Sequence, residues 1–223
     1  MTQTPRLILF GKQGAGKGTQ AQLLVERHNV EHLSTGDIFR AAIKAGTPAG
    51  KEARSFIDQG ELVPDETVIR VVEEKFETTP ELITKGFVLD GFPRTSAQAY
   101  ALEKLLEEKN APLHCAINIE VERDIVLKRI TGRRVCVECG TNYHVDNPPK
   151  KPWTCDVCGG EVRQRPDDSE LAINRRLDLY EKETMPLLKF YEDRDLLEIV
   201  DGLGEAKEVS ERIENIISKR LQG

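Results

Sequence analysis

The fold is decided by one stretch near the start of the chain, RLILFGKQGAGKGT, residues 6–19. Its first five residues form an apolar run that ends at a glycine, as in a strand buried on both faces of a parallel sheet. A helical pattern follows from Lys17 to Arg27. A glycine-rich loop between a buried strand and a helix predicts a phosphate-binding loop.

The residue types in this loop fit phosphate binding. Glycines let backbone N–H groups point inward around an oxyanion, the helix N-terminus adds positive partial charge, and Lys17 adds a full charge. The alternative is an ordinary glycine-rich turn, which the lysine and the flanking strand argue against. A dinucleotide-binding fingerprint is disfavoured because its third glycine or alanine would fall at Thr19. Gly18 stands where many P-loop proteins have the hydroxyl that binds magnesium.

The rest of the chain alternates between strand and helix patterns. Further strands are expected at 86–90, 114–121 and 196–201, and helices at 36–45, 48–59, 66–76, 96–109 and 206–221. Asp65 is a plausible N-cap, and a long helix from Glu170 must bend or restart at Pro186. This alternation predicts an α/β fold, with a parallel-sheet core like that of P-loop nucleoside triphosphate hydrolases and helices on both faces.

Composition narrows the class of protein. With 223 residues and 39% hydrophobic residues, the chain is long enough for one main core and an insertion. No apolar run approaches a membrane span, and the first residues lack the features of an export signal. The formal net charge of −6 argues against non-specific nucleic-acid binding. We therefore expect a cytoplasmic protein with no membrane or nucleic-acid partner.

Four of the five cysteines are paired by spacing in a segment that differs from the rest. Residues 132–166 have little periodicity and no recognisable core, which indicates an insertion. It contains two C-x2-C pairs separated by fifteen residues, Cys136 with Cys139 and Cys155 with Cys158. This spacing predicts a structural zinc site with four thiolate ligands and no open position, the metal replacing a core. Unpaired thiols, or His144 in place of one cysteine, are the alternatives, and Cys115 is expected to be a buried apolar residue.

Three further motifs and one single residue follow in order: STGDIFR at 34–40, GELVPD at 60–65, DGFPR at 90–94, and Gln98. Together with the phosphate loop they make the chain resemble adenylate kinases from Leu7 to about Leu221. The resemblance implies a core at 1–131 and 168–223, with an AMP-binding helical segment at about 34–63, and a lid at 132–167. Two positions depart from it, since Gln13 stands where relatives usually have proline and Lys12 adds a charge beside it.

The resemblance also implies the site residues. The expected ATP site comprises Gly14, Ala15, Gly16, Lys17, Gly18, Thr19, Arg129, Arg133 and Gly204, with Arg129 stacked on the adenine. The expected AMP site comprises Thr35, Arg40, Leu62, Val63, Gly91, Arg94, Gln98, Arg165 and Arg176. The expected catalytic residues are Lys17, Asp90, Arg94, Arg133, Arg165 and Arg176, with Asp90 orienting waters on Mg²⁺. Arg134 and Arg175 are weaker candidates, and Asp167 and Asp168 either pair with lid arginines or cap the helix that follows.

The expected reaction is reversible transfer of a phosphoryl group, ATP + AMP = 2 ADP, by a monomer that uses Mg²⁺ with ATP and holds a structural Zn²⁺. Two guanidiniums can fork onto one phosphate, and a glutamine amide can pair with one edge of adenine. A kinase of another nucleoside monophosphate is one alternative. A zinc-ribbon nucleic-acid-binding ATPase is another. A GTPase-like switch lacks its Asn-Lys-x-Asp motif.

Overall fold

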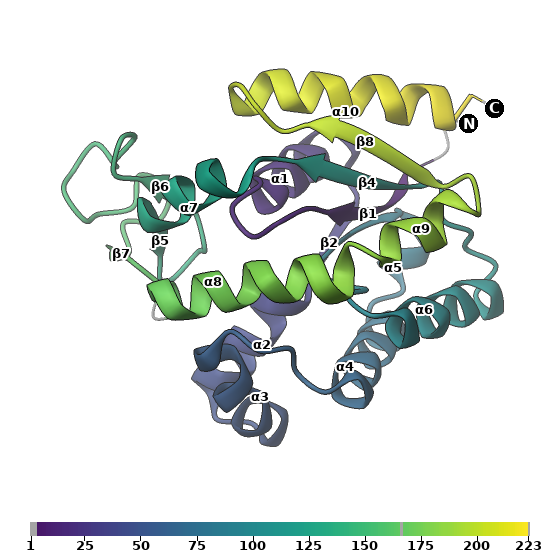
Figure 1. Ribbon diagram of the computed structural model, residues 1–223, viewed down its shortest axis with the longest axis horizontal. Helices are drawn as coiled ribbons and strands as arrows, with labels where there is room; N and C mark the ends of the chain where they lie inside the picture. The colour runs from purple at the N-terminus through teal and green to yellow at the C-terminus, as the bar shows by residue number, and fades with distance from the viewer. Residues whose placement is uncertain (1–3, 166, 223) are drawn as a thin grey trace.

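The structure is a computed structural model that describes residues 4–165 and 167–222. Residues 1–3, 166 and 223, which the predicted domain boundaries include, lie outside the described residues. The main sheet has five parallel strands in the order β2-β3-β1-β4-β8. They are β1 (Arg6–Phe10), β2 (Glu31–Ser34), β3 (Phe87–Asp90), β4 (Cys115–Glu120) and β8 (Leu197–Asp201). Helices cover both faces of this sheet, which confirms the predicted fold class (Figure 1).

Ten α-helices and one π-helical turn are present in the described part of the chain. They are α1 (Lys17–His28), α2 (Thr35–Ala45), α3 (Pro48–Gln59), α4 (Asp65–Thr78), α5 (Glu81–Thr84), α6 (Ser96–Glu108), α7 (Arg123–Thr131), α8 (Glu170–Leu179), η1 (Tyr180–Thr184), α9 (Leu187–Glu192) and α10 (Ala206–Arg220). The predicted α1, α2, α3, α4, α6 and α10 are confirmed to within two residues at either end.

The central strand shows why the sheet needs helices on both sides. Leu7 and Leu9 of β1 pack into a core with α1, α7, α8 and α10, while Ile8 and Phe10 pack into a second core with α2 to α6 and α9. All four side chains are buried. The parallel register places Leu9 of β1 opposite Asp90 of β3 and Ile117 of β4. The loops that leave the carboxyl ends of these strands therefore start side by side.

Two helix predictions need correction. Asp65 is the first residue of α4 and does not cap it, and Pro64 occupies the N-cap position. The Asp65 carboxylate accepts hydrogen bonds from Thr95 Oγ1 at 2.9 Å and Gln98 Nε2 at 2.6 Å, so contacts with α6 have replaced the cap. The helix from Glu170 restarts after Pro186 as expected, but its regular α-helical pattern already ends at Tyr180, where the π-helical turn begins.

The segment between α7 and α8 forms its own small antiparallel sheet, in the order β6-β5-β7. Its strands are β5 (Arg133–Cys136), β6 (Asn142–His144) and β7 (Val162–Arg163). We call residues 132–167 the lid segment, and its strands lie beyond one end of the main sheet, near α7 (Figure 1). Its buried apolar cluster consists of Cys136, Cys155 and Val162, with Tyr143 packed against it.

Candidate functional site

One large cavity of about 1390 Å³ opens at the carboxyl ends of the main strands. It is bordered by the phosphate loop, the start of α2, the turn after α3, the lid segment and α8. Every residue predicted for the two nucleotide sites lines it: Gly14, Ala15, Gly16, Lys17, Gly18, Thr19, Thr35, Arg40, Leu62, Val63, Asp90, Gly91, Arg94, Gln98, Arg129, Arg133, Arg165, Arg176 and Gly204. The structure thus brings the whole set together, while the role of each residue stays a prediction.

The phosphate loop turns where the sequence places its glycines. Gly14 and Gly16 have φ values of +83° and +104°, a region that residues with a side chain rarely adopt. A Cβ on Gly14 would also lie 2.7 Å from Ile130 Cγ1 of α7. The loop can therefore approach α7 closely only with glycine at this position.

Lys17, at the start of α1, folds back onto its own loop. Its Nζ donates to the carbonyl oxygens of Gly11 at 2.7 Å and Lys12 at 3.0 Å. Burial lowers the pKa of Lys17 to about 8, and the nearby cations Arg94 and Arg133 add to this effect, while Asp90 opposes it. The Lys17 amine therefore has few negatively charged neighbours to stabilise its charged form. An anion bound in the cavity would supply this negative charge.

Arg94 also lines the cavity and follows β3. Its Nε donates to Gly91 O at 2.8 Å, and the same carbonyl accepts from Thr35 Oγ1 at 2.9 Å. Burial lowers the pKa of the Arg94 guanidinium, and Arg176 and Arg40 lower it further, against the opposing effect of Asp90. The remaining donors of this guanidinium have no protein acceptor among the described residues, so they are free to bind an anion.

The buried amide of Gln98 is held in one orientation by its neighbours. Its Oε1 accepts from Arg94 N at 2.8 Å and its Nε2 donates to Asp65 Oδ1 at 2.6 Å. Because a carboxylate can only accept, the nitrogen must face Asp65. One donor hydrogen and one lone pair remain on the amide, which is the pair of groups that recognition of an adenine edge requires.

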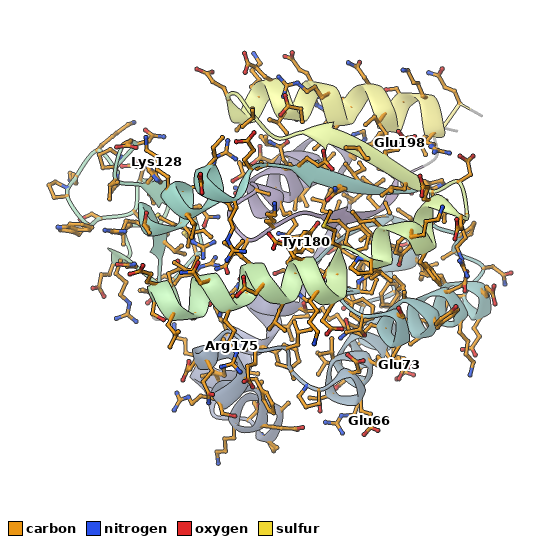
Figure 2. The ribbon with its side chains drawn as sticks, viewed as in Figure 1. Glu66, Glu73, Lys128, Arg175, Tyr180 and Glu198 are labelled. Carbon is orange, nitrogen blue, oxygen red and sulfur yellow. The ribbon has the colours of Figure 1, made fainter. Side chains whose placement is uncertain are left out.

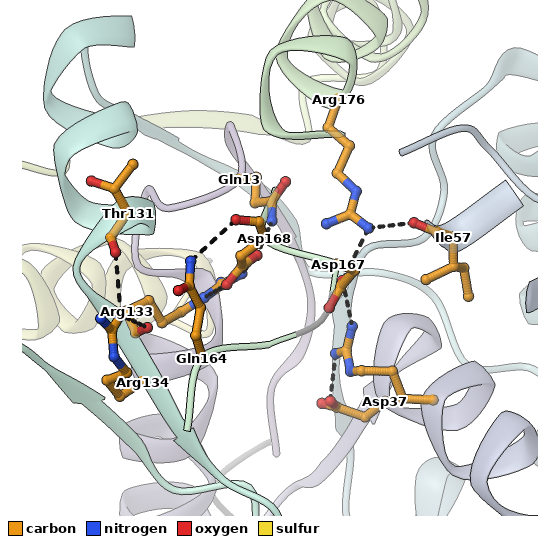
Figure 3. A network of polar contacts seen from close by, with 11 residues as sticks. Gln13, Asp37, Ile57, Thr131, Arg133, Arg134, Gln164, Asp167, Asp168 and Arg176 are labelled. Carbon is orange, nitrogen blue, oxygen red and sulfur yellow. Dashed lines mark hydrogen bonds and ion pairs between the residues drawn. The ribbon is translucent and has the colours of Figure 1, made fainter. Parts of the chain in front are cut away.

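Asp167 pairs with two arginines that line the cavity (Figure 3). Its Oδ2 lies 2.9 Å from an Nη of Arg176 and 3.9 Å from an Nη of Arg40. Arg40 also pairs with Asp37 at 2.5 Å. Although burial opposes it, the surrounding cations Arg176, Arg40 and Arg165 hold the pKa of Asp167 below its usual value. For Arg165, burial and the repulsion of Arg40 and Arg133 lower the pKa to about 10.

Asp168 forms a second junction, between the lid segment and the phosphate loop (Figure 3). It binds Arg133 through both carboxylate oxygens, at 2.9 Å to Nε and 2.5 Å to an Nη. Of the two roles left open for Asp167 and Asp168, the structure selects ion pairing with arginines. The N-cap of α8 is Ser169, whose hydroxyl accepts from Ala172 N at 3.3 Å.

Arg129 of α7 lines the cavity near the phosphate loop. Its two Nη atoms donate to Gly202 O at 3.1 Å and Ala15 O at 3.5 Å, so the guanidinium spans the gap between the phosphate loop and the end of β8. Gly204, which also lines the cavity, has a φ of +104°.

The two weaker arginine candidates have different surroundings. Arg175 lies on the side of α8 that faces α3 and pairs with Glu61, the residue before Leu62 of the expected AMP site (Figure 2). Arg134 instead donates to the carbonyl oxygens of Thr131 and Arg133. Neither residue lines the cavity.

Sequence reasoning missed two supports of the site. Asp37 lies three residues before Arg40 on α2, and this helical spacing could have indicated the ion pair. Tyr180 donates its hydroxyl to Asn118 Oδ1 at 3.0 Å, which joins η1 to the end of β4 beside the cavity (Figure 2). The two residues are 62 positions apart, and no local pattern connects them.

The four paired cysteines meet in the lid segment. Their Sγ atoms all lie within 4.8 Å of one another, with Cys136 3.4 Å from Cys158 and Cys139 3.5 Å from Cys155. A tetrahedral ion with bonds of about 2.3 Å to sulfur would need separations of about 3.8 Å. Backbone N–H groups of Val157 and Gly160 also point at the sulfurs of Cys155 and Cys158, as expected around thiolates. The cluster can therefore hold a metal ion with four sulfur ligands.

Cys115 is fully buried, as predicted, and burial raises its pKa to about 12.

A parallel sheet with a glycine-rich loop and lysine after its central strand, facing arginines across one cavity, defines a P-loop nucleotide kinase. The sequence of residues 9–196 matches the family model described as adenylate kinase. The chain is 50% identical over 212 residues to adenylate kinase of Bacillus subtilis, which covers 95% of this chain and 97% of the relative. It is also 50% identical over 215 residues to adenylate kinase of Carboxydothermus hydrogenoformans, covering 96% of this chain and all of the relative.

The chain therefore belongs to the adenylate kinase family, and it is a phosphotransferase that acts on adenine nucleotides. A third relative, adenylate kinase of Thermodesulfovibrio yellowstonii, is 48% identical over 216 residues, or 96% of this chain and all of the relative. The predicted resemblance and enzyme class are confirmed. None of the helices in the described residues has the length and apolar character needed to span a membrane.

Proposed function

We propose that this enzyme catalyses ATP + AMP = 2 ADP by direct transfer of the γ-phosphoryl group between two nucleotides bound in the one cavity. The observation that carries the proposal is the distribution of cations. Lys17 and the loop amides follow β1, Arg94 follows β3, Arg40 lies on α2, and Arg133, Arg165 and Arg176 line the same cavity. Two phosphate sites with further arginines fit two nucleotides placed end to end.

The chemistry needs charge stabilisation more than proton transfer. The second pKa of a phosphate monoester is about 6, so the AMP oxygen that attacks is already ionised at neutral pH and needs no general base. The charge that develops on the transferring group is offset by Lys17, Arg133 and Arg176. The lid segment would exclude water, which could otherwise accept the phosphoryl group.

Two metal ions belong to the proposal. Mg²⁺ bound with ATP would neutralise charge on the β- and γ-phosphates, and Asp90 is the carboxylate placed to orient its waters. A Cβ on Gly18 would lie 3.8 Å from Asp90 Oδ2, so the absence of a side chain there leaves room beside the carboxylate. The cysteine cluster would hold Zn²⁺, because four thiolates are a typical structural zinc ligand set. We also keep the predicted division into core and lid, and a cytoplasmic monomer, as parts of the proposal.

AMP is proposed as the acceptor because of Gln98 and Thr35. The amide of Gln98 retains one free donor and one free acceptor, and the hydroxyl of Thr35 is directed to Gly91 O beside it. A pyrimidine monophosphate would present a smaller ring with a different edge. The family found by comparison supports the same acceptor over the two alternatives, another monophosphate kinase and a nucleic-acid-binding ATPase.

The test is a coupled assay of ADP formation from ATP with AMP, GMP, CMP and UMP, each at the same concentration. Metal analysis of the same sample would identify the ion in the lid segment. AMP should give the highest kcat/KM, and one zinc should be found per chain. A faster rate with CMP or UMP would overturn the proposed acceptor, and a gel-shift at moderate salt would reveal any nucleic-acid binding.

A further inference from the structure

The Asp168 carboxylate, which is fully enclosed, joins three segments that are distant in sequence. Asp168 follows the lid segment directly, where the chain returns to the core. Its carboxylate binds Arg133, which lies at the start of the lid segment, where the chain leaves the core. Its Oδ1 also accepts from Gln13 Nε2 of the phosphate loop at 3.2 Å. Gln164 Nε2 donates to the Asp168 backbone oxygen at 3.2 Å. The position of Arg133 is thus fixed by a carboxylate that is itself fixed partly by the phosphate loop (Figure 3).

The Gln13 amide can have only one orientation in this contact. A buried carboxylate paired with a guanidinium is an acceptor, so the nitrogen of the amide must face it. Gln13 Oε1 is then buried and makes no hydrogen bond within residues 4–165 and 167–222. A glutamine that only filled space would not be expected to bury an unpaired oxygen. The contact with Asp168 is therefore what holds this side chain in place.

The neighbouring loop residue makes a contact of the same kind. Lys12 Nζ lies 3.9 Å from Glu181 in η1, and Glu181 is also paired with Arg123 at 3.3 Å. Two consecutive side chains of the phosphate loop, Lys12 and Gln13, thus contact residues that follow the lid segment. The loop is tied to this chain by side chains as well as by packing.

We propose that Gln13 is a positioning residue for phosphoryl transfer, which acts through Asp168 to hold the Arg133 guanidinium in place above the phosphate loop. The inference rests on the proposed role of Arg133 in that reaction. In this proposal Gln13 touches no reacting atom. It changes the rate of phosphoryl transfer through Arg133, which lies in the lid segment. Replacing the amide with a carboxylate of the same size and shape would turn the donor to Asp168 into a repelling charge and a competitor for Arg133.

The test compares Gln13→Glu and Gln13→Ala with the wild type, each alone and in an Arg133→Ala background. We expect Gln13→Glu to lower kcat about tenfold and Gln13→Ala about threefold, with KM for ATP changed less than twofold, because the arginine is displaced from the transition state. In the Arg133→Ala background neither substitution should lower kcat further. Gln222→Glu, which adds the same charge at an exposed position near the C-terminus, should behave as the wild type.

Thermal melts of each variant show whether a loss of rate reflects unfolding, and Gln13→Ala keeps the test valid if Gln13→Glu does not fold. A Gln13→Glu enzyme with wild-type kcat would overturn the inference. So would an equal loss of kcat with and without Arg133. If Arg133→Ala alone retained full activity, the proposed role of Arg133 would be wrong, and this outcome is separate from a failure of Gln13 alone.

Discussion

At the scale of single residues, the cavity contains cations that repel one another, and the proposed binding of phosphates would offset this repulsion. Arg94 is half-buried near Arg40 and Arg176, and within the described residues its side chain has one carbonyl contact, with Gly91 O, which is not essential because this oxygen also accepts from Thr35. We predict that Arg94→Met lowers kcat by at least about 100-fold through lost charge stabilisation. The free energy of unfolding should stay equal or rise. Steady-state kinetics and urea denaturation of the same sample would check both, and a destabilised variant would show that Arg94 is mainly structural.

Lys17 gives a second prediction at this scale, through its proton. Its pKa of about 8 in the ligand-free structure should rise when the phosphates of ATP enter, because nearby negative charge favours the ammonium form. Above pH 8 a substantial part of the free enzyme is unprotonated at this site, so ATP binding should take up a fraction of a proton. Calorimetry in buffers with different ionisation enthalpies would measure the uptake. Lys17→Met should abolish it, and an unchanged uptake in that variant would place the proton elsewhere.

At the scale of secondary-structure elements, prediction from sequence succeeded where a pattern was long or strongly apolar. RLILF at 6–10 was predicted with the correct bounds, and α3 was also correct at both ends, because Thr47, Pro48 and Gly60 mark its limits. β2 was missed, since only four residues form it and Glu31 and His32 are polar. The π-helical turn at Tyr180 was also missed, because no local pattern of residues in 180–184 marks it.

The lid sheet is the element whose stability should depend most on the proposed ion. Within the described residues its buried cluster consists of Cys136, Cys155 and Val162, which is too little apolar surface to fold a segment of this size. We predict that a metal-free preparation loses hydrogen-exchange protection in β5 to β7 while β1 and β4 stay protected. Mass spectrometry of exchanged peptides would show this, with the metal-loaded protein as control. Equal protection of the lid in both samples would mean that the cluster is not its support.

At the scale of the whole molecule, the charge is divided unevenly. The chain has a formal net charge of −6, yet seven predicted ligands of the nucleotide phosphates and bases in one cavity are cationic: Lys17, Arg40, Arg94, Arg129, Arg133, Arg165 and Arg176. The sequence could predict which residues meet, because Lys17, Arg40 and Arg94 lie in quoted motifs and the other four arginines follow from the resemblance to adenylate kinases. It could not predict which carboxylate holds which arginine, since Asp167 and Asp168 are adjacent and their partners depend on the path of the lid segment.

This concentration of positive charge gives the last prediction. A dinucleotide of two adenosines joined by five phosphates would span both ends of the cavity and relieve the mutual repulsion of its arginines. At about 1,000 times its Kd it should stabilise the fold by about 4 kcal/mol, which corresponds to a rise in Tm of about 8–16 °C for a chain of this size. ATP alone or AMP alone at the same concentration should give smaller shifts, because each occupies one end and gains nothing from linkage to the other. Calorimetric titration should give one dinucleotide per chain. Binding of ATP that still proceeds on the enzyme saturated with the dinucleotide would show that the two phosphate sites do not belong to one reaction centre.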